Sequence, residues 1–364
     1  MNERQIMTTI EGKITEGQAS WSSRLQKLTI GTDNLTEIQL VKPNQAFLAT
    51  PRGILNVNVE GTTITHETVP LPQKVSGEIA SIFFVDSSLG WTALRKKPAD
   101  VLDGEGFESL VLNTLNGGLN WYGQYERKAQ ELERIVFLDD HEGWMVGSAL
   151  TSSQTLSHRL LVLHTTDGGE HWSDVSAGLN RFGQGRIADV YADPSQVLMV
   201  TSDRSVIGSN DAGQNWQRLG QIEGEPPQVA MYRIGSAPDG RLWVLGGTGG
   251  REGTWSILAV KTDKSIWTKN KIYDVLFKDA AFLSNQEVIA CGVLQSNNKV
   301  PLLDDDHRVG AILRSSDGGR NWTVIYRDPK AKSINAIAVE EGRYVWAVGD
   351  DGVILRITAT TKIN

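Results

Sequence analysis

One short motif occurs four times in the chain, with tryptophan at its last position. The copies start at residues 114, 165, 209 and 315, and they read TLNGGLNW, TTDGGEHW, SNDAGQNW and SSDGGRNW. The carboxylate or amide at the third position can accept hydrogen bonds from backbone N–H groups further along, and glycine supplies a positive φ. The tryptophan then covers the turn as an apolar plug. The motif therefore predicts a tight hairpin turn, and its repetition predicts a repeat fold.

The spacing of the motif indicates a β-propeller. Tryptophans at positions 121, 172, 216, 267 and 322 lie 51, 44, 51 and 55 residues apart, a period typical of four-stranded blades. Seven short apolar strands with small residues recur in a second register, from Phe47-Leu-Ala to Trp346-Ala-Val-Gly. Alternating apolar patterns and glycine-rich turns surround them. We therefore expect an all-β seven-bladed propeller with four-stranded blades.

The two ends of the chain are expected to meet in one blade. The last repeat stops after its third strand, residues 352–357, whereas residues 21–28 have a strand-like pattern. An unpaired outer edge invites aggregation, so this N-terminal strand is expected to close the last blade. The expected organisation is a flexible N-terminus over residues 1–10 and a single propeller over residues 11–360. Residues 11–28 would complete the C-terminal blade.

The motif resembles the Asp-box, or BNR repeat, Ser/Thr-x-Asp-x-Gly-x-x-Trp. Together with the Gly-Trp-x-x-Gly pattern, the sequence Ile-Leu-x-x-x-Asp-Gly-Gly-x-x-Trp resembles the photosystem II stability/assembly-factor-like propellers. This resemblance implies a non-enzymatic scaffold that binds protein. It also implies a structural role in the box turns for Asn116, Trp121, Asp167, Trp172, Asp211, Trp216, Asp317 and Trp322.

Composition favours a soluble protein. No run of about 18 apolar residues is present, and the N-terminus lacks the apolar region of a signal peptide. We therefore expect a cytoplasmic monomer without membrane insertion, or a periplasmic one only if an export signal was removed. Cys291 is the single cysteine and is expected to be a buried thiol. The net charge of −7 disfavours nucleic acid and is compatible with a basic protein partner.

Long connections between second and third strands predict the binding surface. They are expected at residues 95–108, 150–158, 247–254 and 294–309, all on the face opposite the box turns. Charged residues give this face a mixed character that suits a folded protein. The predicted protein-binding residues are Arg95, Lys96, Lys97, Arg251, Asp304, Asp305, Asp306 and His307. The acidic run lacks the alternating ligands of a calcium loop, and no histidine pair has zinc-ligand spacing. No metal or cofactor is expected.

Three functions remain open at this point. The first is an assembly-factor-like or chaperone-like scaffold, and the second is an immunity or antitoxin-type protein that neutralises a basic toxin. The third is a sialidase-like glycoside hydrolase, because sialidases share the Asp-box. Their first arginine usually stands in an Arg-Ile-Pro motif, whereas Arg-Ile pairs here are followed by Val, Ala, Gly or Thr. The sequence therefore favours a non-enzymatic binding protein, and no catalytic residue is assigned.

Overall fold

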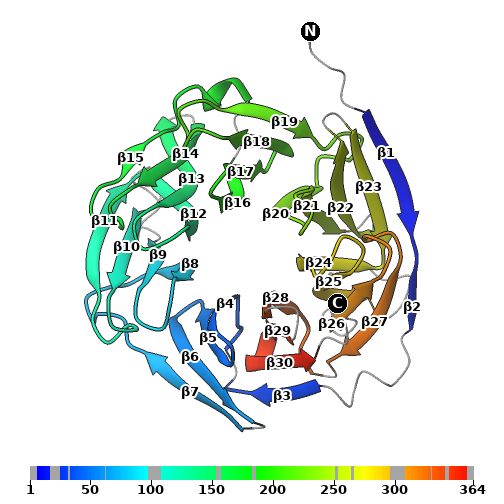
Figure 1. Cartoon of the computed structure of the whole chain (residues 1–364), viewed down its shortest axis with the longest axis horizontal. Helices are drawn as coiled ribbons and strands as arrows, with labels where there is room; N and C mark the ends of the chain where they lie inside the picture. Colours follow the sequence, from blue (N-terminus) through cyan, green and yellow to red (C-terminus); the bar gives the residue numbers. More distant parts are fainter. Residues whose placement is uncertain are drawn as a thin grey trace. The chain divides into compact units, whose positions relative to one another are not determined.

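The computed structural model describes residues 6–16, 25–31, 33–61, 63–96, 108–152, 157–182, 186–250, 253–263, 266–295, 308–328, 330–340 and 344–358. They form the predicted all-β seven-bladed propeller with four-stranded blades (Figure 1). The chain divides into two compact units, one of residues 41–221 and one of residues 1–40 with 222–364. A single domain over residues 11–360 stays a prediction.

Blades 1 to 4 are four-stranded sheets in which consecutive strands lie side by side. Blade 1 contains β4 (Glu37–Lys42), β5 (Gln45–Thr50), β6 (Gly53–Glu60) and β7 (Thr63–Val69). Blade 2 contains β8 (Glu78–Phe84), β9 (Gly90–Lys96), β10 (Glu108–Thr114) and β11 (Tyr122–Lys128). Blade 3 contains β12 (Gln130–Phe137), β13 (Gly143–Ser152), β14 (Ser157–Thr165) and β15 (Ser173–Asp174). Blade 4 contains β16 (Ile187–Asp193), β17 (Gln196–Thr201), β18 (Ser205–Ser209) and β19 (Gln217–Gln221).

Blades 5 to 7 include the N-terminal strands. Blade 5 contains β20 (Ala230–Ser236), β21 (Leu242–Gly250), β22 (Gly253–Asp263) and β23 (Ile266–Tyr273). Blade 6 contains β24 (Val275–Phe282), β25 (Val288–Gln295), β26 (Arg308–Ser315) and β27 (Trp322–Arg327). Blade 7 contains β28 (Ile334–Glu340), β29 (Tyr344–Gly349), β30 (Val353–Thr358) and, from the N-terminus, β3 (Leu25–Thr29).

The N-terminal strand closes the last blade, as predicted. Strand β3 pairs antiparallel with β30, from Leu25 opposite Ile357 to Thr29 opposite Val353. A salt bridge of 2.5 Å between Lys27 Nζ and Asp328 Oδ2 holds the same strand from the side. The outer edge of β30 is therefore paired by a segment from the other end of the sequence.

The residues before β3 differ from the prediction. Strand β1 (Ile6–Gly12) pairs parallel with β23, and β2 (Ile14–Glu16) pairs parallel with β27. Each adds a fifth strand to the outside of its sheet, as Figure 1 shows. The expected flexible N-terminus is therefore wrong for residues 6–10, and residues 11–16 belong to blades 5 and 6 rather than to the last blade. Isoleucine at position 14 packs against the core of blades 5 and 6, which explains the attachment.

The box turns share one hydrogen-bond scheme. In the third copy, Gly213 N–H donates to Ser209 Oγ at 2.8 Å, and Asn215 N–H donates to Asp211 Oδ1 at 2.8 Å. Gly213, at the fifth position of this copy, adopts φ 86°, and an added Cβ would lie 3.1 Å from the Trp216 ring. The side chain at the third motif position thus accepts a backbone N–H of the turn, and the tryptophan ring covers the glycine. Equivalent bonds form at Asn116, Asp167 and Asp317.

Aromatic rings pack between neighbouring blades. The Trp91 ring stacks on Phe137 of the next blade with centroids 3.6 Å apart and an interplanar angle of 11°. Glycine precedes the tryptophan because a Cβ at Gly90 would lie 2.3 Å from the Phe84 ring. Cys291 is buried in β25 as predicted, and burial raises the pKa of its thiol well above the usual value. The described residues contain no helix with the length and apolarity needed to cross a membrane.

The first strands of blades 2 to 7 share a β-bulge that the sequence did not predict. The pairing register shifts at residues 79/81, 132/134, 187/189, 231/233, 277/279 and 334/336. A bulge inserts one residue and re-aims the side chain that follows it. In four blades the residue after the bulge is charged, and these are Arg134, Asp189, Arg233 and Asp279.

Two of the expected long loops are extended hairpins. Strands β21 and β22 remain paired up to Gly250 opposite Gly253, so residues 247–254 are mostly sheet. Strands β13 and β14 likewise pair up to Ser152 opposite Ser157. Glycine and serine patterns do not distinguish a long hairpin from an open loop. The connections at residues 97–107 and 296–307 lie outside the described residues.

Two N-terminal deletions separate the roles of these strands. Deleting residues 1–16 removes β1 and β2, and we expect a folded, soluble protein of lower stability. Deleting residues 1–29 also removes β3 and exposes the edge of β30, so we expect aggregation. Size-exclusion chromatography with thermal unfolding measures both. A soluble, folded, monomeric protein after the longer deletion would contradict the closure of the last blade by β3.

Two box tryptophans should differ in their contribution to stability. Trp322 is 1% exposed, whereas Trp121 is partly exposed. Trp322→Ala should lower the free energy of unfolding by about 3–5 kcal/mol, the usual cost of truncating a buried aromatic residue. Trp121→Ala should cost less because its indole already contacts solvent. Urea denaturation compares the two, and equal costs would contradict this ranking.

Candidate protein-binding surfaces

Only two of the predicted binding residues lie in the described part of the chain. Arg95 and Lys96 end strand β9, and Lys96 Nζ lies 3.3 Å from Glu108 Oε2 at the start of β10. The others lie outside the described residues, and they are Lys97, Arg251, Asp304, Asp305, Asp306 and His307.

A buried carboxylate lies between two arginines beside the end of β9. Arg95 Nη1 is 3.3 Å from Glu131 Oε1, and Arg186 Nη1 is 2.6 Å from Glu131 Oε2. The Glu131 side chain is 6% exposed, whereas that of Arg186 is 44% exposed. Arg95 Nη1 also lies 3.0 Å from Glu133 Oε2, and burial raises the pKa of Glu133 despite the attraction of Arg95. Arg95 is thus already paired, and Arg186 is the arginine of this cluster that faces solvent.

Arginine–aspartate pairs join neighbouring first strands within each unit. Arg134 Nε lies 3.2 Å from Asp189 Oδ1 and joins β12 to β16. Arg233 Nε lies 3.3 Å from Asp279 Oδ1 and joins β20 to β24. Asp279 Oδ2 also accepts a hydrogen bond from the N–H of Ile337 at 3.1 Å. The contacts occupy Asp189 Oδ1 and both oxygens of Asp279, so these aspartates link neighbouring blades.

The turns of residues 41–221 separate charge between two faces. We call the turns that join first to second and third to fourth strands the box face. In its described turns, residues 43–44, 61, 85–89, 115–121, 138–142, 166–172, 194–195 and 210–216, lysine and arginine do not occur. The carboxylates in these turns are Asp86, Asp139, Asp140, Glu142, Asp167, Glu170 and Asp211.

The opposite face, which we call the loop face, is cationic. It consists of the turns between second and third strands and of the connections between blades. Its described residues, 51–52, 70–77, 129, 175–182, 186 and 202–204, contain one carboxylate, Asp203. The cations in these turns are Arg52, Lys74, Arg181, Arg186 and Arg204. The sequence predicted a mixed-charge surface, whereas the described turns of this face are mainly basic.

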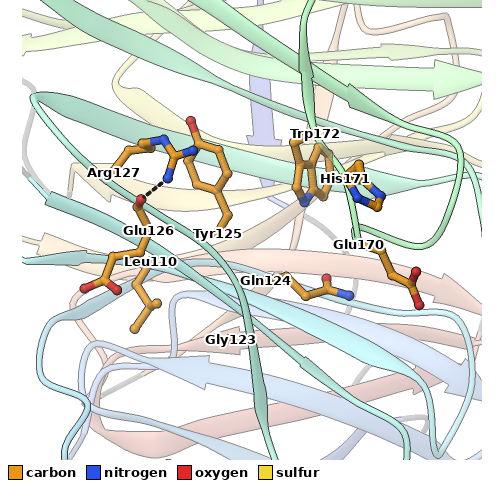
Figure 2. Close-up of a pocket in the computed structure, with 9 residues that line it drawn as sticks. All are labelled: Leu110, Gly123, Gln124, Tyr125, Glu126, Arg127, Glu170, His171 and Trp172. Carbon is orange, nitrogen blue, oxygen red and sulfur yellow. Dashed lines mark hydrogen bonds between the residues drawn. The ribbon is translucent and has the colours of Figure 1, made fainter.

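A groove of about 520 Å³ lies between β11 and the box turn of blade 3. Figure 2 shows Tyr125 and Arg127 on one side and Trp172 and His171 on the other. Gln124 fixes its floor, because it donates to the carbonyl of Gly168 at 2.9 Å. The groove is lined mainly by polar side chains. These side chains could form hydrogen bonds with a peptide, whereas a small molecule usually binds in a closed, mostly apolar pocket.

An apolar cluster lies on the box face of blade 2. Leu115 and Leu119 are 64% and 75% exposed, Tyr122 is 57% exposed and Val85 is 38% exposed. The sequence analysis missed this cluster. Its signal was present in the repeats, because the second and sixth motif positions are Leu115 and Leu119 in the first copy and polar in the other three.

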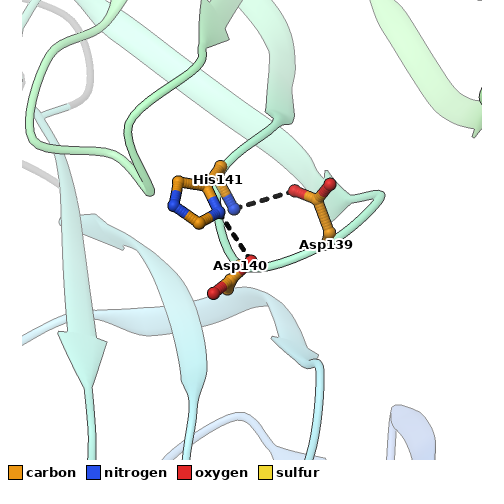
Figure 3. A group of neighbouring side chains, drawn as sticks. All are labelled: Asp139, Asp140 and His141. Carbon is orange, nitrogen blue, oxygen red and sulfur yellow. Dashed lines mark hydrogen bonds and ion pairs between the residues drawn. The ribbon is translucent and has the colours of Figure 1, made fainter.

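Two groups on the box face place metal-ligand atoms within 4.8 Å of one another. One is Asp139, Asp140 and His141 (Figure 3). Asp139 Oδ1 accepts the N–H groups of His141 and Glu142, both at 2.8 Å, so this carboxylate closes the turn. The other group contains Asp167, Glu170 and His171, and Asp167 closes its turn in the same way. In each group a histidine ring also contacts a carboxylate, His141 Nδ1 with Asp140 Oδ1 at 2.6 Å and His171 Nδ1 with Asp167 Oδ2 at 2.7 Å, and the absence of a metal stays a prediction.

Comparison with known proteins shows a resemblance to one family over part of the chain. A family model described as Photosynthesis system II assembly factor YCF48 matches residues 105–242. The photosystem II assembly lipoprotein Ycf48 of Synechococcus sp. (strain CC9902) is 28% identical over 115 residues, which is 31% of this chain and 31% of that protein. This chain resembles the photosystem II assembly-factor propellers. The match with the curated relative spans about a third of either length.

Solved structures agree on the fold. The structure of YCF48 bound to D1 peptide has a TM-score of 0.63 and 17% identity, covering 95% of this chain and 99% of that one. YCF48 from Cyanidioschyzon merolae has a TM-score of 0.61 and 17% identity, covering 92% and 98%. The GH74 xyloglucanase from Xanthomonas campestris has a TM-score of 0.63 and 16% identity, covering 92% and 54%. At these identities the likeness shows the fold alone.

The predicted cytoplasmic location is wrong. It rested on the polar character of the first residues, whereas the curated relative is a lipoprotein. The polarity of an N-terminal segment was therefore a poor guide to the compartment.

A charge effect should be measurable at the second box. The backbone N–H of His171 lowers the pKa of Asp167 from 3.8 to about 2, with further help from the His171 side chain and the Thr165 hydroxyl. The folded-state pKa is depressed, so this charge stabilises the protein above the unfolded pKa, and the effect is lost as pH falls towards about 2. Asp167→Asn should therefore melt below wild type at neutral pH, with a difference that shrinks below about pH 4. Thermal unfolding across pH measures this, with Glu67→Gln on β7 as the control. A difference in melting temperature between wild type and Asp167→Asn that does not depend on pH would contradict the prediction.

Proposed function

We propose that the chain is a non-enzymatic propeller scaffold that binds a protein client on the loop face of residues 41–221, in the manner of an assembly factor. The observation that carries the proposal is the charge of this face. Five arginines and lysines lie in its described turns against Asp203 alone. A surface of one sign steers an oppositely charged partner and suppresses wrong ones. The expected client segment is therefore acidic.

The comparisons support a protein client. The family model matches residues 105–242, which include most of blades 2 to 4. A structure of the same fold is bound to a D1 peptide. An extended segment of a larger protein is therefore the first kind of client to test, and the D1 peptide is the first probe.

The arginine–aspartate links support a role without catalysis. Asp189 and Asp279 are each held by an arginine within 3.3 Å. A retaining or inverting glycosidase needs two carboxyl groups placed on either side of a bond, with one of them able to carry a proton. Aspartates held as structural links between blades do not provide that pair.

Lys97 lies outside the described ranges and belongs to the same proposal, whereas Arg251, Asp304, Asp305, Asp306 and His307 belong to the other compact unit, where binding stays a separate prediction. Lys97 lies between β9 and β10, and Asp304, Asp305, Asp306 and His307 lie between β25 and β26. Arg251 lies between β21 and β22. All of these segments connect second to third strands, the class of connection that lies on the loop face in blades 1 to 4.

Charge reversal on exposed residues tests the proposed face. Arg52 and Lys74 are exposed on the loop face, and Lys42 is exposed at the other end of blade 1, at the end of β4. The Arg52→Glu/Lys74→Glu protein should bind the D1 peptide, or a client captured from the source lysate, about tenfold more weakly than wild type, because each change replaces attraction by repulsion. Lys42→Glu should bind as wild type does. Calorimetry or anisotropy measures the binding.

Two results would contradict the proposal. Equal losses for the Arg52→Glu/Lys74→Glu and Lys42→Glu proteins would place the client elsewhere. Hydrolysis of xyloglucan or of a sialoside by the purified wild-type protein would contradict the non-enzymatic role.

A further inference from the structure

The box turn of blade 2 exposes two leucines where the other box turns carry polar residues. Leu115 and Leu119 are 64% and 75% exposed, which is more than any other large apolar side chain in the described residues. Neither side chain contributes to the hydrogen bonds of the turn, which come from Thr114 and Asn116. The turn therefore does not need leucine at these positions, and their exposure calls for another explanation.

Two further exposed apolar residues lie in the neighbouring turn or directly after the box turn. Tyr122 begins β11 directly after the turn and is 57% exposed. Val85 lies in the turn between β8 and β9, which is joined to the box turn by a hydrogen bond of 2.8 Å from Gly117 N–H to the carbonyl of Ser88. Of the five exposed large apolar residues in the described chain, four thus lie in two bonded turns or directly after them. We call Val85, Leu115, Leu119 and Tyr122 the apolar cluster.

The described box-face turns of blades 2 and 3 carry carboxylates but no lysine or arginine. Asp86 follows Val85 directly, and the neighbouring blade contributes Asp139, Asp140, Glu142 and Glu170 from its two turns. The N–H of Leu89 and then that of Ser88 lower the pKa of Asp86, so its charge persists in mild acid. The cation beside the cluster is Lys42, whose Nζ lies 3.0 Å from Ser87 Oγ.

The box turns of the other compact unit provide a contrast. Among the described turns of blades 5 and 6, residues 237–241, 283–287 and 316–321, the carboxylates are balanced in part by arginine. These charged residues are Asp239, Arg241, Glu287, Asp317 and Arg320. The combination of exposed leucines and unbalanced acidic turns is therefore a property of blades 2 and 3 and not of box turns in general.

We propose that the apolar cluster and the carboxylates of the box-face turns of blades 2 and 3 form a second docking surface, which binds a cationic protein segment carrying aliphatic side chains. Apolar residues at the centre with charge at the rim are the usual anatomy of a protein interface. Charge complementarity selects the partner, because an acidic segment would be repelled by the carboxylates of these turns, which outnumber the single cation Lys42. This surface is on the face opposite the proposed client site and does not depend on it.

Binding of designed peptides tests this proposal. The probe is a fluorescent peptide of about 12 residues in which lysine and leucine alternate, measured by anisotropy near physiological salt. The wild-type protein should bind it, whereas a lysine–serine peptide and a glutamate–leucine peptide should bind at least about tenfold more weakly. The Leu115→Ser/Leu119→Ser protein should lose about tenfold in affinity, and the conservative Leu115→Met/Leu119→Met protein should retain it.

Charge variants separate specific docking from general attraction. Glu170 is exposed in the box turn of blade 3, whose Gly168 carbonyl accepts hydrogen bonds from Trp91 and Gln124 of blade 2, and Glu67 is exposed on β7 of blade 1. Glu170→Lys should weaken binding of the lysine–leucine peptide several-fold more than Glu67→Lys. The Arg52→Glu/Lys74→Glu protein should not weaken it, which keeps this test independent of the proposed client site.

Three results would overturn the proposal. The first is no binding of the lysine–leucine peptide at about 100 μM, and the second is equal binding by the wild-type and Leu115→Ser/Leu119→Ser proteins. The third is wild-type self-association that the double serine variant abolishes in sedimentation velocity. That result would show that a second copy of this chain, and not a cationic segment, covers the cluster.

Discussion

Closure of the turns by carboxylates is the interaction on which the surface of residues 41–221 depends. Short antiparallel strands need turns whose backbone N–H groups find acceptors, because unpaired groups are costly. Asp86 and Asp139 each accept two N–H groups in turns after first strands, and Asp167 and Asp211 accept N–H groups in box turns. Strand direction alternates within a blade, so all of these turns lie at the same end of the strands. The chemistry that closes the turns therefore makes this face acidic.

The opposite face uses such carboxylates less often, although Asp174 accepts the N–H of Ser176 there, and its described turns within residues 41–221 are mainly cationic. Part of the positive charge of this face is neutralised by a buried carboxylate, because Glu131 pairs with both Arg95 and Arg186. The described turns of residues 41–221 therefore carry opposite charge at the two ends of the strands. The two proposals together describe a protein that holds two different segments at once, as an assembly scaffold would. The N-terminal strands β1 and β2 pair with outer edges in blades 5 and 6.

The sequence predicted the fold well because the box repeats report it directly. Each copy combines a turn acceptor, a glycine of positive φ and a covering tryptophan, and their spacing counts blades. Closure by β3 followed from the missing fourth strand of the last repeat. Strands β1 and β2 were missed because Thr8, Thr9 and Glu11 are polar, and edge strands with one face in solvent carry little apolar pattern. The bulges and the Arg134–Asp189 link depend on register, which a single sequence does not reveal. The apolar cluster was visible in the first motif copy but was read only as part of a turn.

The central claim is that the two faces of residues 41–221 bind different partners. Hydrogen–deuterium exchange of the client complex tests this most directly, because it reports on each turn separately. We expect the bound client to slow exchange at residues 70–77, 175–182 and 202–204 on the loop face and to leave exchange at residues 85–89 and 115–121 unchanged. Protection of the box-face turns by the same client, with the loop face unchanged, would contradict it.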